Sequence, residues 1–88
     1  MTWTREAVRA ELLKLFQEHA EGEAEVTEKS HLVADLSFDS LGVMEVIADI
    51  EDKFKVSIPD EALQEVETIA DVNRMIAARL DVEGRLEG

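Results

Sequence analysis

Cysteine and tyrosine are absent from this 88-residue chain, and proline and tryptophan occur once each. The absence of cysteine excludes disulfides, thiolate metal sites and a cysteine nucleophile, so any thiol chemistry would need a thiol from an attached group. No apolar run is long enough to cross a bilayer, and the N-terminus lacks the apolar core of a signal peptide. The expected location is therefore cytoplasmic.

Positive charge is scarce. Nine Lys and Arg residues face 21 Asp and Glu residues, which gives a formal net charge of −12. Nucleic acids and anionic membranes repel such a polyanion, so neither is expected as a partner. Basic protein surfaces are favoured instead. Apolar residues make up 45% of the chain, enough for the core of one small domain.

The spacing of apolar residues predicts helices. A 3.6-residue period runs from Thr4 to Ala20, from Asp39 to Phe54, and from Thr68 to Leu80. A short helical turn is expected at Asp60–Gln64, directly after Pro59. No segment is convincing as a strand. The predicted fold is all-α, a small bundle of three long helices and one short helix.

The connection after the first helix is predicted to be long. Residues 21–30 are polar and include Gly22, which is typical of a loop. Leu32, Val33 and Leu36 are expected to attach the rest of this connection to the core. Residues 1–80 should form the four-helix domain, and residues 81–88 a flexible tail.

One serine stands where chemistry is possible. Ser40 should begin the second long helix, preceded by Asp39, a good N-cap residue. Its hydroxyl should be exposed, and a phosphate ester there would be stabilised by the helix dipole by roughly 0.3–1 kcal/mol. By itself, the Asp-Ser-Leu triplet is better explained by an ordinary N-cap pair, because such triplets are common by chance.

The surrounding sequence changes this balance. Asp35-Leu-x-x-Asp-Ser-Leu41 is followed by an acidic amphipathic helix that ends at Phe54, and then by Ile58-Pro-Asp-Glu61. This combination closely resembles the acyl carrier protein family over about residues 4–80, and the helix that opens at Thr68 is in register with it. The resemblance implies that Ser40 accepts 4′-phosphopantetheine from coenzyme A, transferred by a separate phosphopantetheinyl transferase with a magnesium ion.

The resemblance also implies a carrier and not an enzyme. The thiol of the arm would hold acyl groups as thioesters for other, acyl-handling enzymes, and the carrier is expected to act as a monomer. Three positions depart from the family pattern: Ser37 replaces a usual glycine, Gly42 an acidic or polar residue, and Lys53 a frequent acid. These departures bear on the choice of partner enzymes and not on the attachment serine.

Acidic residues cluster on one face of the second helix. Glu45, Asp49 and Asp52 fall opposite the apolar face on a helical wheel. An ordinary solvated face explains them as well as a docking surface does. The resemblance implies that the acids matching Asp39, Glu45, Glu51 and Asp52 meet basic patches on partner enzymes, and the wheel adds Asp49.

No metal site is expected. His19 and His31 are far apart and lack ligand spacing. Asp35, Ser37 and Asp39 alternate like the first ligands of an EF-hand, but the loop fails at the glycine and glutamate positions that such a site requires. Both histidines are interpreted as surface or partly packed residues.

Five apolar residues are candidates for lining an acyl pocket between the second helix and the short helix: Val43, Met44, Ile47, Leu63 and Ile69. They could equally complete a dry core. The resemblance favours a pocket and a fatty-acid or polyketide cargo. An amino-acyl or peptidyl carrier, and an acidic helical adaptor that is never modified, are the alternatives.

Overall fold

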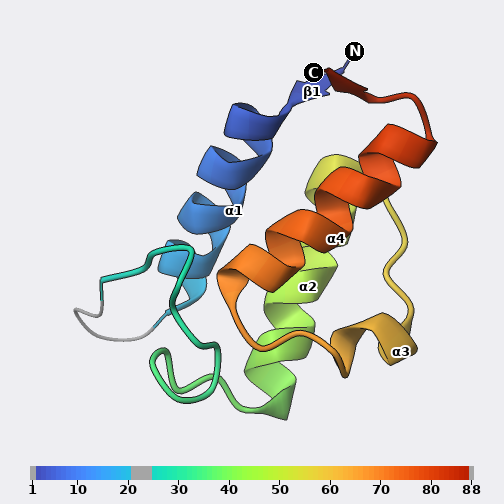
Figure 1. Cartoon of the computed structure of the whole chain (residues 1–88). Helices are drawn as coiled ribbons and strands as arrows, with labels where there is room; N and C mark the ends of the chain where they lie inside the picture. The colour runs from blue at the N-terminus through green and yellow to red at the C-terminus, as the bar shows by residue number, and fades with distance from the viewer. Residues whose placement is uncertain (1, 21–24, 88) are drawn as a thin grey trace.

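The computed structural model describes residues 2–20 and 25–87, which fold into a bundle of helices with one pair of very short strands. In chain order the elements are β1 (Trp3–Thr4), α1 (Arg5–His19), α2 (Ser40–Phe54), α3 (Asp60–Leu63), α4 (Ile69–Val82) and β2 (Leu86–Glu87). Helices α2 and α4 run in the same direction, and α1 runs opposite to both (Figure 1). The prediction of three long helices and one short helix is confirmed.

Each long helix begins at a side-chain cap. The side chains of Thr4, Asp39 and Thr68 each accept a hydrogen bond from the backbone N–H three residues later, at 3.0, 2.7 and 3.3 Å. These bonds satisfy donors that the first turn of a helix otherwise leaves free. The predicted helix starts are therefore set by local chemistry.

The core lies between the three long helices. Each contributes the apolar face that its sequence period predicted, because helical spacing places residues three and four apart on one side. The side chains that are fully buried and largest are Phe16, Phe54, Leu12, Ile50, Ile69, Ile76, Leu80, Val8, Val46 and Val72. Burial of this kind stabilises a fold by about 0.8 kcal/mol for each CH₂ removed from water.

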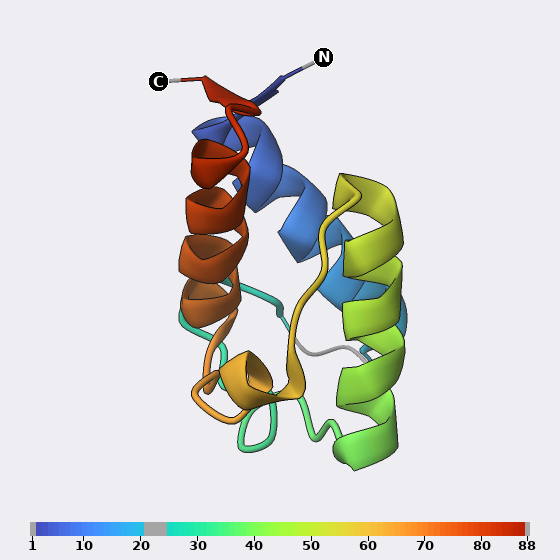
Figure 2. The ribbon, with the colours of Figure 1, turned by 90° about the vertical axis from the view of Figure 1, so that its right-hand side faces the viewer.

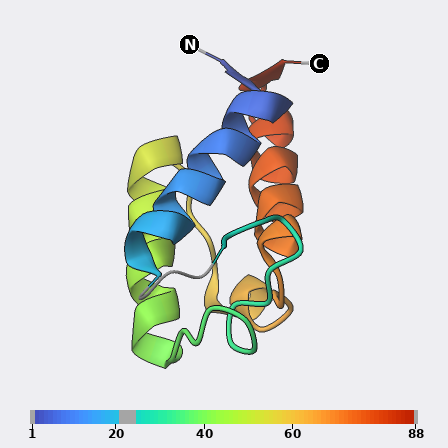
Figure 3. The same ribbon diagram turned by 90° about the vertical axis from the view of Figure 1, so that its left-hand side faces the viewer.

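The connection between α1 and α2 is hydrogen-bonded to the start of α4. The backbone N–H of Leu32 donates to the Glu67 carbonyl at 2.9 Å, and that of Ile69 to the Ser30 carbonyl at 3.2 Å. Residues 25–39 therefore run beside the first part of α4 and then down to the end of the bundle where α2 begins (Figure 3). The part of the predicted loop at residues 21–24, including Gly22, lies outside the described residues.

Two of the three residues expected to anchor this connection do so. Leu32 and Leu36 are buried, but Val33 is 62% exposed, so the prediction for Val33 is wrong. Val33 lies in a tight turn that begins at His31, and this turn directs it outward. Phe38, which directly precedes the cap of α2, is buried and packs its ring 6.1 Å from that of Phe16.

The two ends of the chain meet. Strand β1 pairs with β2 in parallel, with Trp3 opposite Leu86, although the sequence indicated no strand. That prediction is wrong because a pairing of two residues leaves no alternating pattern to detect. Arg85 donates to the backbone carbonyls of Phe54 and Lys55 at the end of α2. Helix α4 continues two residues past the predicted domain boundary at residue 80, and the flexibility of the tail stays a prediction.

None of the helices in the described ranges is both long and apolar enough to cross a membrane.

Candidate functional site

Ser40 is the first residue of α2, at the end of the bundle away from the two chain termini (Figure 1). Its side chain is exposed, and its hydroxyl has no hydrogen-bond partner among the described residues. Asp39 caps the helix by accepting from the Gly42 N–H at 2.7 Å, which leaves Ser40 without a capping role. An exposed hydroxyl with no structural bond is free to be esterified.

The first turn of α2 also has donors to spare. The backbone N–H groups of Ser40 and Leu41 have no acceptor within residues 2–20 and 25–87, whereas the next two are bonded to Asp39. A phosphate ester on Ser40 would lie close to these two donors and to the positive end of the helix dipole. The site therefore fits a phosphodiester without any need to break an existing bond.

Local geometry bears on two of the residues beside Ser40 that depart from the family pattern. Ser37 has φ +58°, a left-handed conformation that suits the usual glycine better than serine. Gly42 is packed closely: a Cβ there would meet both an Asp39 carboxylate oxygen and the Phe38 ring at 3.2 Å. The glycine therefore leaves room for the cap and for Phe38.

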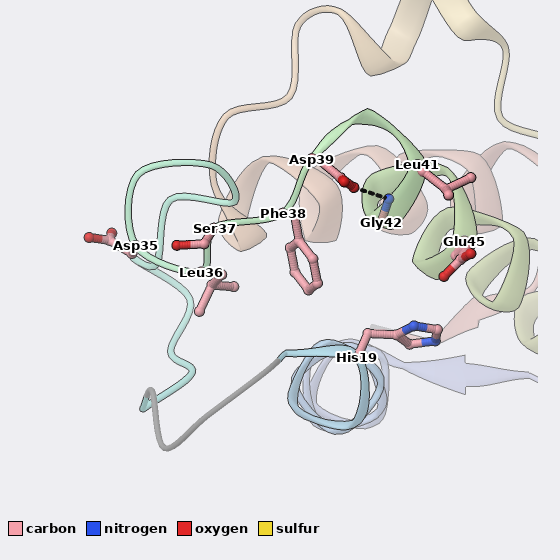
Figure 4. A pocket seen from close by; sticks show the side chains of 9 residues that line it. All are labelled: His19, Asp35, Leu36, Ser37, Phe38, Asp39, Leu41, Gly42 and Glu45. Carbon is pink, nitrogen blue, oxygen red and sulfur yellow. Dashed lines mark hydrogen bonds between the residues drawn. The ribbon is translucent and has the colours of Figure 1, made fainter.

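A polar hollow of about 500 Å³ lies on one side of the start of α2. Its charged and titratable side chains are His19 from α1, Asp35 and Asp39 from the preceding loop, and Glu45 from α2. Figure 4 shows His19 reaching from α1 toward the side of α2 that bears Glu45. Leu36, Ser37, Phe38, Leu41 and Gly42 complete the lining.

An apolar groove of about 310 Å³ lies on the other side, and Ser40 is part of its lining. The short helix α3 lies at the same end of the bundle as the first turns of α2 and supplies one wall (Figure 2). The other lining residues are His31, Leu32, Val33, Phe38, Asp39, Val43, Met44, Leu63, Gln64, Val66 and Glu67.

The structure brings three of the five pocket candidates to this groove. Val43, Met44 and Leu63 line it together with Ser40. Ile47 and Ile69 do not line it: they are 3% and 1% exposed, in the core beneath. A helical wheel places Ile47 one turn from Val43 on the same face of α2. It does not show how far along the helix the buried core extends.

The acidic residues of α2 differ in how they are bonded. Asp49 contacts the His19 ring at 2.5 Å, and Glu51 accepts from the Ile58 N–H at 2.8 Å. Asp52 is highly exposed and has Lys55 at 3.7 Å. Glu45 has no partner in the described part of the chain. Three of the predicted docking acids, Asp39, Asp49 and Glu51, therefore already accept hydrogen bonds within the fold, and Asp52 has an exposed ion pair.

Two histidines that the sequence did not mark as functional border the site, His19 in the polar hollow and His31 in the apolar groove. Neither histidine stands at a recognisable sequence spacing from Ser40, because His19 belongs to α1 and His31 to the loop. Only the folded chain brings each of them to the start of α2.

Comparison with known proteins agrees with this geometry. The family model described as "Phosphopantetheine attachment site" matches residues 7–76. The chain is 38% identical to the acyl carrier protein of Rhodococcus erythropolis over 85 residues, which cover 96% of this chain and 92% of that protein. It is 37% identical to the acyl carrier protein of Phenylobacterium zucineum over 68 residues, with 76% and 86% covered.

A solved structure of the acyl carrier protein from Enterococcus faecalis is also similar. The TM-score is 0.73 at 33% identity, and the match covers 88% of this chain and 99% of that one.

Proposed function

The chain belongs to the acyl carrier protein family, whose cofactor is covalently bound 4′-phosphopantetheine, and we propose that Ser40 is the residue that carries it. The observation behind the proposal is the exposed, unbonded Ser40 hydroxyl at the start of α2, next to two free backbone donors. The arm supplies the thiol that a chain without cysteine lacks. Ser40 is an attachment point and performs no catalysis.

We further propose that the cargo is of the fatty-acid or polyketide type. The apolar groove beside Ser40, with Val43, Met44 and Leu63 in its wall, supports this choice because an alkyl chain gains about 0.8 kcal/mol for each CH₂ it removes from water. An amino-acyl cargo would bring a charged amine to a largely apolar wall. The amino-acyl carrier therefore stays the second candidate.

Partner enzymes of this monomeric carrier would dock on α2. Glu45 is the acid best placed for this, since it is exposed and has no partner among the described residues. Leu41 and Met44, 65% and 61% exposed, flank it with apolar surface. A basic patch with an apolar centre on a phosphopantetheinyl transferase or an acyl-handling enzyme would complement this surface.

Intact-mass measurement tests the attachment residue. The protein is incubated with coenzyme A, magnesium and a broad-specificity phosphopantetheinyl transferase, and one arm should be added per chain. Ser40→Ala should remain folded by circular dichroism and gain no mass. Ser57→Ala, which removes another exposed hydroxyl, should be modified like the wild type. A modified Ser40→Ala chain would refute the assignment, and an unmodified wild type would favour the non-covalent adaptor.

A further inference from the structure

The ring of His31 is held in one tautomer by its own loop. Its Nδ1 accepts hydrogen bonds from the backbone N–H groups of Val33 at 3.3 Å and Ala34 at 3.1 Å. A ring nitrogen that accepts cannot carry the proton, so the neutral ring must carry it on Nε2. The free N–H of the imidazole therefore points away from the loop amides.

The backbone of His31 is fixed as firmly as its ring. Its N–H donates to the Asp35 carboxylate at 2.7 Å, and its carbonyl accepts from the N–H groups of Asp35 and Leu36. An isolated bridge also joins His31 to Thr68, at the start of α4. A side chain supported on two sides presents its remaining donor in a defined position.

His31 is one of the residues that line the apolar groove. His31 is half-buried and lines the groove together with Ser40, and its Nε2–H has no acceptor among the described residues. Much of the neighbouring wall is apolar, with Val43, Met44 and Leu63 contributing. An unpaired donor in such a wall gains from any acceptor that displaces its water.

We propose that the His31 Nε2–H donates a hydrogen bond to a carbonyl oxygen of the 4′-phosphopantetheine arm when an acyl chain lies in the apolar groove. The inference rests on the proposed function, because it requires an acyl group carried on Ser40. The apolar chain draws the end of the arm toward the groove, and the amide or thioester carbonyls that follow lose water there. His31 acts as a positioning residue that restores one of the lost hydrogen bonds.

Nitrogen-15 NMR on histidine-labelled protein tests the contact directly. Spectra are compared for the unmodified protein, the form with a bare arm and a form loaded with a medium-chain acyl group. The His31 Nε2–H signal should be unchanged by the bare arm, then shift and exchange more slowly with water on acyl loading. The His19 signals serve as an internal control and should stay in place. A His31 signal that ignores the acyl group, or that shifts fully with the bare arm, would overturn the proposal.

A substitution separates this role from a purely structural one. His31→Asn keeps a short acceptor for the loop amides but loses the ring N–H. In the wild type, the rise in melting temperature on acyl loading should grow with chain length. In His31→Asn the rise should be smaller by the same amount at every length, because one hydrogen bond is lost while the apolar burial is kept.

A structural role for His31 would lower the unmodified and loaded forms equally and leave the rise on loading as in the wild type. That result would refute the proposal even if the variant were less stable. His19→Asn, on the polar hollow, is the matched control and should keep the full rise. Intact mass confirms loading in each sample, so failure of attachment at Ser40 is distinguished from failure of the His31 contact.

Discussion

Ser37 adopts a backbone conformation that suits glycine better than serine, with φ +58°. For a residue with a Cβ, the left-handed region costs roughly 1–2 kcal/mol. The Ser37 N–H donates to the Val33 carbonyl, a bond that any residue there could make. The chain therefore retains this conformational strain in the loop next to Ser40.

We expect Ser37→Gly to raise the free energy of unfolding by about 1 kcal/mol, because relief of the strain outweighs the added flexibility of the unfolded chain. Urea unfolding would measure the change. Ser57→Gly is the matched control: Ser57 is exposed and is not a positive-φ residue, so its replacement should reduce stability. Equal effects of the two substitutions would contradict the strain argument.

The acids of α2 should separate into two groups by their bonds. Glu51→Ala should lower the free energy of unfolding by about 1–3 kcal/mol, because it leaves the Ile58 N–H without its charged acceptor. Glu45→Lys should leave stability within about 0.5 kcal/mol, since the side chain is exposed and has no partner in the described residues.

The two substitutions should affect partner binding in the opposite order to their effects on stability. Glu45→Lys should weaken titration against a phosphopantetheinyl transferase, and added salt should reduce the wild-type affinity toward that of the variant. A folded Glu51→Ala protein should lose less affinity. If affinity is indifferent to both salt and Glu45→Lys, the acidic face is merely solvated.

At the scale of elements, the start of α4 is held by a capping box, in which Thr68 and Asp71 bond to each other's backbone N–H groups. The side chain of Asp71 accepts from the backbone N–H groups of Glu67 and Thr68, while Thr68 caps the helix in return. Bonds from the Thr68 and Glu67 N–H groups, with a smaller contribution from Arg74, lower the pKa of Asp71 from 3.8 to about 2, against the opposing effect of burial.

This lowered pKa predicts a pH dependence. A carboxyl group with a depressed folded-state pKa stabilises the fold fully above its unfolded value and loses that effect as pH falls through the folded value. Asp71→Ala should therefore cost about 1 kcal/mol near neutral pH, and the difference from the wild type should vanish between pH 3.8 and about 2. Urea unfolding across this range measures it. Asp81→Ala, on the exposed face of the same helix, should show no such convergence.

Helices could be predicted from the sequence because their signals are local. Caps at Thr4, Asp39 and Thr68 and the apolar period between them fix where each helix begins and which face it buries. The strand pairing of the termini could not be predicted, because it joins two-residue segments more than eighty positions apart. The outward turn of Val33 was missed for a similar reason, since it depends on the backbone bonds that follow His31.

The candidate site was predictable in part. Ser40 and its capping Asp39 were identified by their place at a helix start, and the structure finds both there. The bonds that engage Asp49 and Glu51 were not predictable, because their partners His19 and Ile58 come from other segments. A wheel shows which face a residue occupies but not what reaches that face from elsewhere.

For the whole molecule, the net charge of −12 sets the response to salt. Repulsion among the acids disfavours the compact state, and it is screened over about 10 Å at 0.1 M ionic strength. Sodium chloride should therefore raise the melting temperature at neutral pH, with the steepest rise at low concentration. Glycerol or sucrose, which do not screen charge, provide the comparison. A midpoint that falls or stays constant with salt would show that self-repulsion does not limit stability.

The parallel pairing of β1 with β2 places the N-terminal and C-terminal segments at one end of the bundle, while the first turn of α2 lies at the other end (Figure 1). A fluorescent label, a bead or a solid support attached to either end would therefore lie far from Ser40, the proposed attachment site. Because paired parallel strands have their outer ends facing opposite ways, tension applied between the two termini would load this pair in shear. The carrier could thus be tethered by both ends, with the swing of its arm unobstructed.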